Sequence, residues 1–162
     1  KSGAAEGIID DGQWAPQINL GIPVMIPDDY VPDLNLRLSL YRRLSDQDSD
    51  GDLDRFAAEL VDRFGPMPLE VENLLGVMEI KKLCRIANVA KLDAGPKGAM
   101  IAFHEDIFPN VDGLMKYLEK QRGMAKLRPD QKLVFPRAWE DRKQRLAGAT
   151  RLLQELADVA VS

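Results

Sequence analysis

Cysteine and histidine are nearly missing from this sequence of 162 residues, which contains one of each. The single cysteine, Cys84, excludes an internal disulfide and a zinc site built on several cysteines. The single histidine, His104, has no second histidine or cysteine at the spacing of metal ligands, so we expect a solvent-facing strand residue. These residues predict no metal site, and so low a cysteine content is typical of a reducing cytoplasm.

Long apolar runs and an excess of basic residues are also lacking. No stretch approaches the ~20 apolar residues that cross a bilayer, and the start of the chain shows no signal-peptide pattern. We therefore expect a cytoplasmic protein without membrane contact. The formal net charge of -4 argues against a dedicated nucleic-acid binder, which needs a basic face to displace phosphate counterions. Because the chain begins at Lys1 rather than at a methionine, we expect a fragment of a larger protein.

The residues that are present indicate one globular domain, since 45% of them are hydrophobic and 30% are charged. The segment from Ile22 to Pro68 carries the clearest local signals. It contains a turn bracketed by prolines at 27–32, then Asp33, whose side chain can cap the helix that follows. A second helix ends at Gly65, which suits a left-handed C-terminal position and is followed by a proline.

Apolar periodicity predicts an α+β domain of about five helices packed on a small, mainly antiparallel sheet of about four short strands. The expected strands cover residues 18–26, 90–93, 99–104 and 132–135, and Gly95–Gly98 joins the middle two as a hairpin loop. The expected helices cover residues 34–44, 53–64, 69–89, 111–122 and 138–161, the last of them with Trp139 on its apolar side.

The acidic segment from Asp46 to Asp54 resembles the start of a calcium-binding loop. Acidic residues occupy loop positions one, three, five and nine, and Gly51 occupies position six. Position twelve is Ala57, which cannot supply the carboxylate that normally completes the ion's shell. We therefore interpret the segment as an exposed acidic turn whose negative charges interact favourably with the positive N-terminal end of the following helix. A calcium-binding helix-loop-helix module is the alternative.

No catalytic group of residues is evident. The segment Gly95–Gly98 does not have glycine, lysine and a hydroxyl at the spacing of a phosphate-binding loop, and no serine lies in a nucleophile elbow. The last helix is basic on one side but also carries acidic residues, so a solvated face is the preferred interpretation. Its basic residues, including one just before it, are Arg137, Arg142, Lys143, Arg145 and Arg151. We expect no enzymatic activity and no cofactor in this chain.

One charged group remains on the second helix of the central segment. Glu59, Asp62 and Arg63 are spaced i, i+3 and i+4, so all three project from one face. Composition alone favours an exposed face in which Glu59 and Arg63 form a pair worth a few tenths of a kcal/mol.

Several motifs together resemble the C-terminal domain of bacterial transcription-repair coupling factor, the Mfd-type DNA translocase. They are IPDDYVPDLNLRLSLYRRL, ELVDRFGPMP, the strand LVFP and the last helix with its tryptophan. The resemblance covers the chain from about Pro16 to Ser162, and the acidic turn is where the chain departs most from the family. It implies that residues 1–17 are the linker from an upstream motor and that 18–162 form a regulatory domain.

The resemblance also implies partners for the whole protein. Members of this family bind ATP with magnesium in the motor, move along duplex DNA, displace stalled RNA polymerase and recruit the excision-repair protein UvrA. The terminal domain is expected to hydrolyse nothing and to cover the UvrA-binding module of the same protein. Family contacts to that module map onto Glu59, Asp62 and Arg63, with Leu53, Arg55 and residues 65–68 as expected surroundings.

One further alternative is a DNA-contacting accessory domain. It would use Arg37, Arg42 and Arg43 of the first helix together with the basic last helix. Such a domain should bind duplex DNA with a steep salt dependence.

Overall fold

The computed structural model describes residues 14–46 and 52–162, and it confirms the α+β class. Five α-helices and a five-stranded sheet lie within these ranges, one strand more than expected. The helices are α2 (Leu34–Ser45), α3 (Asp52–Phe64), α4 (Leu69–Ala87), α5 (Val111–Lys120) and α6 (Arg142–Val161). The strands are β1 (Gln17–Asn19), β2 (Val89–Gly95), β3 (Gly98–Phe103), β4 (Lys126–Leu127) and β5 (Leu133–Pro136). A short 3-10 turn, His104–Asp106, follows β3.

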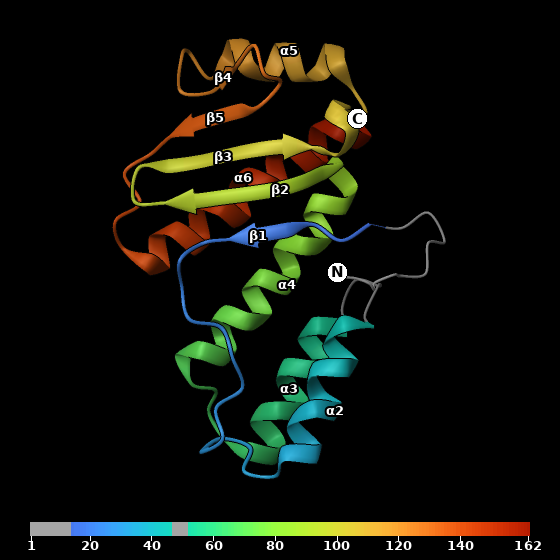
Figure 1. Cartoon of the computed structure of the whole chain (residues 1–162), viewed down its shortest axis with the longest axis vertical. Coiled ribbons are helices and arrows are strands. Elements are labelled where there is room, and N and C mark those ends of the chain that lie inside the picture. Colours follow the sequence, from blue (N-terminus) through green and yellow to red (C-terminus); the bar gives the residue numbers. More distant parts are fainter. Residues whose placement is uncertain (1–13, 47–51) are drawn as a thin grey trace.

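The sheet has the strand order β1-β2-β3-β5-β4 and is mainly antiparallel, as expected (Figure 1). Among the described strands, only β1 pairs in parallel, with Ile18 opposite Leu92 of β2. The expected hairpin is present, because β2 and β3 pair antiparallel and Gly95 lies opposite Gly98. Of the expected linker, residues 1–13 lie outside the described residues, and its last residue, Gln17, begins β1.

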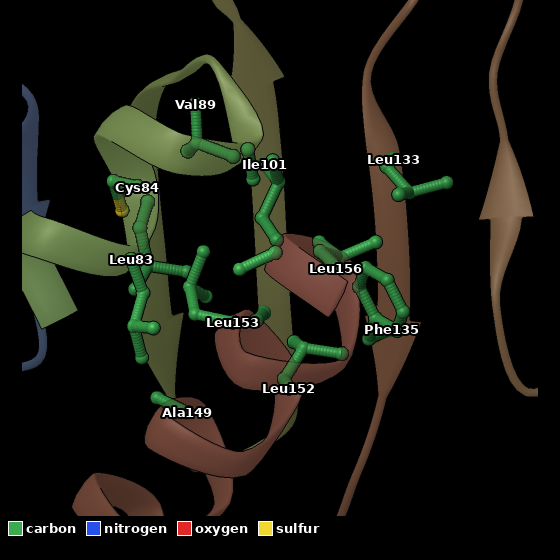
Figure 2. Packing of buried hydrophobic residues seen from close by; sticks show 14 of the residues in the cluster. Leu83, Cys84, Val89, Ile101, Leu133, Phe135, Ala149, Leu152, Leu153 and Leu156 are labelled. Carbon is green, nitrogen blue, oxygen red and sulfur yellow. The ribbon is translucent and has the colours of Figure 1, made fainter. Parts of the chain in front are cut away.

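The larger hydrophobic core lies between one face of the sheet and helices α4 and α6. Figure 2 shows side chains of α6, among them Leu153 and Leu156, pointing toward Ile101 of β3 and Phe135 of β5. These four side chains are fully buried. Alternation along β3 and β5 places every second residue in this core, which is why short strands suffice to close it.

A second, smaller core holds α2 and α3 against the first half of α4, so α4 contributes to both cores (Figure 1). Its central side chains include Leu40 of α2, Phe56 and Leu60 of α3, and Val71 of α4. The molecule therefore has a helical lobe, formed by α2, α3 and the start of α4, and a sheet lobe, formed by the rest of α4, α5, α6 and the strands.

Residues 20–26 run between the two lobes rather than continuing the first strand. Arg145 of α6 donates to the Leu20 carbonyl at 2.8 Å, and Asn73 of α4 donates to the Pro23 carbonyl at 3.0 Å. Gly21 has a φ of +65°, which turns the chain out of the sheet. The expected strand 18–26 is therefore wrong beyond residue 19, although Ile26 is buried in the helical lobe.

The helix ends largely agree with the sequence. The Asp33 side chain accepts from the Leu36 backbone N–H at 3.1 Å, and Gly65 has the left-handed φ of +93°. The last helix begins at Arg142 and not at 138, because Asp141 caps it by accepting from Lys143 N–H. Trp139 thus precedes the helix. Among the described residues, no helix has the length and apolarity that a bilayer crossing requires.

Candidate functional site

The candidate site lies on the outer face of α3, opposite the buried side chains Phe56 and Leu60. The expected pair within the helix is confirmed, since Arg63 Nη1 donates to Glu59 Oε2 at 2.9 Å. Asp62 is exposed and makes no ion pair within ranges 14–46 and 52–162. The structure therefore brings the three predicted residues together, with Asp62 as the carboxylate that remains available.

A residue from another helix completes the group. Arg43 of α2 donates through Nη1 and Nη2 to the two oxygens of Glu59, both at 2.8 Å. Its guanidinium also lies 5.0 Å from the centre of the Phe56 ring, and that of Arg63 lies 5.0 Å from the Phe64 ring. Glu59 therefore joins α2 to α3 through a bidentate hydrogen bond with Arg43. Its planar geometry is more specific than the contact of a simple charge such as a lysine ammonium.

The two arginines fix the charge of Glu59. Hydrogen bonds from Arg43 and then from Arg63 favour the ionised form and lower the pKa of Glu59 to about 2. The same contact with Glu59 raises the pKa of Arg43. Because 33% of the Glu59 side chain is exposed, water screens these interactions and limits their contribution to stability.

The end of α3 is held firmly to the rest of the helical lobe. The Tyr30 hydroxyl donates to the carbonyls of Leu60 at 3.2 Å and Gly65 at 2.8 Å. The Tyr30 ring also packs against Phe64 with a centroid distance of 5.7 Å. These contacts satisfy carbonyl groups at the helix end, so Asp62 and Arg63 project from a fixed backbone.

Of the expected surroundings, Arg55 is exposed and lies one turn before Glu59 on the same face. Leu53 does not lie on this surface, because only 7% of it is exposed and it packs in the core of the helical lobe. The expectation for Leu53 was wrong, because its position one turn before Phe56 directs it into the core.

Several arginines that a DNA-binding surface would need are occupied inside the domain. Arg37 donates to the carbonyls of Val31 and Pro32, and Arg43 binds Glu59. Arg145 is 6% exposed and donates to the carbonyls of Trp139, Leu20 and Glu140. The interpretation of Arg145 as part of a solvated basic face was therefore wrong.

His104 lies in the turn after β3, where its ring stacks on Trp14 with a centroid distance of 4.5 Å. Within the part of the chain that the structure describes, no group of three or more acidic, histidine or cysteine residues could hold a metal ion. Of the acidic turn that the calcium alternative would use, residues 47–51 lie outside the described residues.

Fold and site together define an α+β domain of two lobes that presents a charged helix face, held by side chains of two helices. The profile of the TRCF domain family matches residues 20–114, which is more than half of the chain. The chain belongs to this family of transcription-repair coupling factor domains.

Curated relatives support this assignment over nearly the whole chain. The transcription-repair-coupling factor of Rickettsia conorii is 38% identical over 154 residues, which cover 95% of this chain. That of Escherichia coli is 29% identical over 162 residues, or 100% of the chain. The chain spans about 14% of the length of each of these relatives.

A solved structure shares the fold. The crystal structure of a C-terminal domain of transcription-repair coupling factor superposes with a TM-score of 0.75 at 21% identity. The match covers 91% of this chain and 94% of that chain. At this identity the likeness establishes the arrangement of helices and strands, and not the residues of a site.

Proposed function

We propose that this chain is the non-catalytic, autoinhibitory C-terminal domain of an ATP-dependent DNA translocase that acts in the cytoplasm. The whole protein would displace stalled RNA polymerase and recruit UvrA for nucleotide excision repair. This domain would cover the UvrA-binding module of the same protein until the motor engages polymerase. Family membership supports the repair role, and the charged face of α3 supports the masking role.

The observation that carries the masking role is the state of Asp62. Its carboxylate is exposed and without an ion pair in the described ranges, whereas the neighbouring Glu59 is held by two arginines. A charge fixed on a rigid helix and not used inside its own domain is suited to pairing across an interface. Arg55, also exposed, lies on the same face.

The charges of this face specify the partner surface. Arg43, Arg55 and Arg63 carry positive charges and Glu59 and Asp62 negative ones, so the face is mixed in sign. A complementary surface needs a base opposite Asp62 and an acid opposite the arginines, which sets the register of docking. A surface of mixed charge also gives an intramolecular contact of moderate affinity, which a competing partner can displace.

The test is charge reversal at Asp62 in the intact translocase. Asp62→Lys removes one attraction and adds a repulsion, so it should increase UvrA affinity about fivefold, as expected for roughly 1 kcal/mol at an exposed pair. The measurement is UvrA binding by fluorescence anisotropy, with helix content checked by circular dichroism. Glu59 is a poorer target, since its reversal would also break the Arg43 contact between α2 and α3.

The matched control is Glu119→Lys, which makes the same charge change on the exposed surface of α5, at the far end of the molecule from α3 (Figure 1). It should leave UvrA affinity at the parent value. An unchanged UvrA affinity in a folded Asp62→Lys variant, or an equal increase in both variants, would show that this face does not mask the module.

A further inference from the structure

A polar cavity of about 360 Å³ lies in the sheet lobe, remote from the charged face of α3. It is open to solvent on one side and is lined by the end of α5, the segment that leads from β5 into α6, and α6 itself. Five of its lining side chains carry charge or hydrogen-bonding groups. They are Gln121, Arg137, Trp139, Arg151 and Glu155.

The wall of this cavity contains a buried donor without a partner. Trp139 is 8% exposed, and its indole N–H makes no hydrogen bond to any residue of ranges 14–46 and 52–162. A Cβ built on Gly148 would lie 2.6 Å from Trp139 Nε1, so the N–H edge of the indole lies against a residue that lines the cavity. A buried N–H without an acceptor is destabilising, so such a group in a native structure calls for an explanation such as a bound ligand, ion or water.

The Glu155 carboxylate does not accept a hydrogen bond from the Trp139 indole N–H, because it is directed toward the Tyr117 hydroxyl. It accepts from the Tyr117 hydroxyl at 2.7 Å. Burial and this hydrogen bond raise the pKa of Tyr117, so the hydroxyl stays protonated and remains a donor to Glu155. Although Arg151 lies four residues before Glu155, the two form no ion pair within the described part of the chain.

Hydrogen bonds position Arg137, and neither arginine of the cavity forms an ion pair within the described residues. Arg137 Nη1 donates to the carbonyls of Met124 and Pro136, both at 2.7 Å, which fixes its guanidinium plane. No hydrogen bond involves its Nη2 or Nε in the described ranges. Arg151 is exposed at the rim. Two arginines against one glutamate leave an excess of one positive charge beside a neutral indole donor.

We propose that this cavity binds a carboxylate, supplied either by a small free acid or by an acidic side chain of a peptide. The fork of N–H donors on Arg137 and Arg151 matches the two oxygens of a carboxylate, and the indole N–H adds a third donor. A single negative charge balances the excess positive charge. A phosphate dianion would overcompensate it and repel Glu155, so carboxylate is the better ligand.

The test observes the indole N–H directly in the 162-residue chain. A proton–nitrogen correlation spectrum contains two indole signals, from Trp14 and Trp139, and Trp14→Phe assigns them. Sodium acetate and a capped Glu-Leu-Glu peptide are titrated separately. Either probe should shift the Trp139 signal downfield in a saturable manner, because a hydrogen bond forms at that proton.

Variants then establish the role of charge. Arg151→Gln should weaken binding about tenfold or more, as expected when a charged hydrogen bond is lost. Glu155→Gln retains an acceptor for Tyr117 but removes the competing charge, so it should strengthen binding. The control, Arg42→Gln, changes an exposed arginine of the other lobe and should bind as the parent does.

The outcomes separate the possible sources. Saturation by acetate identifies a free-acid site, whereas saturation by the peptide alone identifies a peptide site. The proposal is overturned if neither probe shifts the Trp139 signal, or if Arg151→Gln binds as tightly as the parent. Tighter binding of inorganic phosphate than of acetate would contradict the assignment to a carboxylate.

Discussion

Arg43 controls the charge state of Glu59 more strongly than Arg63 does, because it contributes two hydrogen bonds where Arg63 contributes one. Replacing Arg43 with Gln should therefore raise the pKa of Glu59 from about 2 toward its ordinary value of 4.5. The change should stay incomplete, since Arg63 still donates. Carbon NMR of the Glu59 carboxyl group, followed as a function of pH, measures this pKa.

The same titration has a consequence for stability. Because the pKa of Glu59 is lower in the folded state, its contribution to the free energy of unfolding is complete above about pH 4.5. It is lost as the pH falls from about 4.5 to 2, and in Arg43→Gln the loss should be smaller. For an exposed pair the contribution is about 0.2–1 kcal/mol. A larger pKa rise in the control Arg63→Gln than in Arg43→Gln would reverse the ranking of the two arginines.

For single residues, the sequence predicts contacts within a helix but not contacts between helices. The pair of Glu59 and Arg63 followed from their spacing alone, since residues i and i+4 are neighbours on any helix. Arg43 could not be predicted, because its contact with Glu59 depends on how α2 and α3 pack. Arg145 shows the same limit, since its three carbonyl partners include Leu20, 125 residues away.

Two glycines within helices show how closely elements approach one another. A Cβ on Gly148 of α6 would lie 2.5 Å from Cε2 of the Trp139 ring, whereas one on Gly76 of α4 would lie 3.0 Å from the tip of Leu146. Alanine at either position gains about 1 kcal/mol of helix propensity. The rigid Trp139 ring has less freedom to move away from a new methyl group than the flexible end of Leu146 has. The cost of overpacking should therefore exceed the gain in helix propensity only at Gly148.

Gly148→Ala should therefore destabilise the domain by about 1–2 kcal/mol, and Gly76→Ala should be nearly neutral or stabilising. Chemical denaturation of both variants measures the difference, with Gly76→Ala as the matched control. Equal stability of the two variants would mean that the Trp139 ring moves without cost. Its indole signal would then also shift in the spectrum of Gly148→Ala.

Element boundaries were predictable where a single local signal ends the element. Asp33 and Gly65 are such signals, and both ends of the helix pair agree with them. The strand expected at 18–26 was wrong for a physical reason. The alternating apolar residues of this segment are buried in two different cores and do not share one face of a strand. Leu20 is buried in the sheet lobe and Ile26 in the helical lobe, and the backbone between them runs across a boundary.

The two lobes of the whole molecule differ in the size of their cores. Within the described residues, the core of the sheet lobe contains 22 buried side chains and that of the helical lobe eight. Both share the continuous helix α4, and residues 20–26 cross between them. Since burial of apolar surface dominates stability, the helical lobe should open at a lower free energy than the sheet lobe.

Hydrogen exchange can compare these opening energies through two matched truncations. Leu60 of α3 and Leu133 of β5 are both fully buried, and alanine at either site should cost about 2–5 kcal/mol. Leu60→Ala should lose protection in α2 and α3 while β3 and the middle of α6 keep theirs. Leu133→Ala should lower protection in both lobes, because opening the sheet lobe removes the support of α4.

If Leu60→Ala lowers protection equally in β3 and α3, the lobes unfold as one unit. A helical lobe that opens separately would mean that the charged face of α3 can be released without disturbing the sheet lobe, as a reversible mask requires.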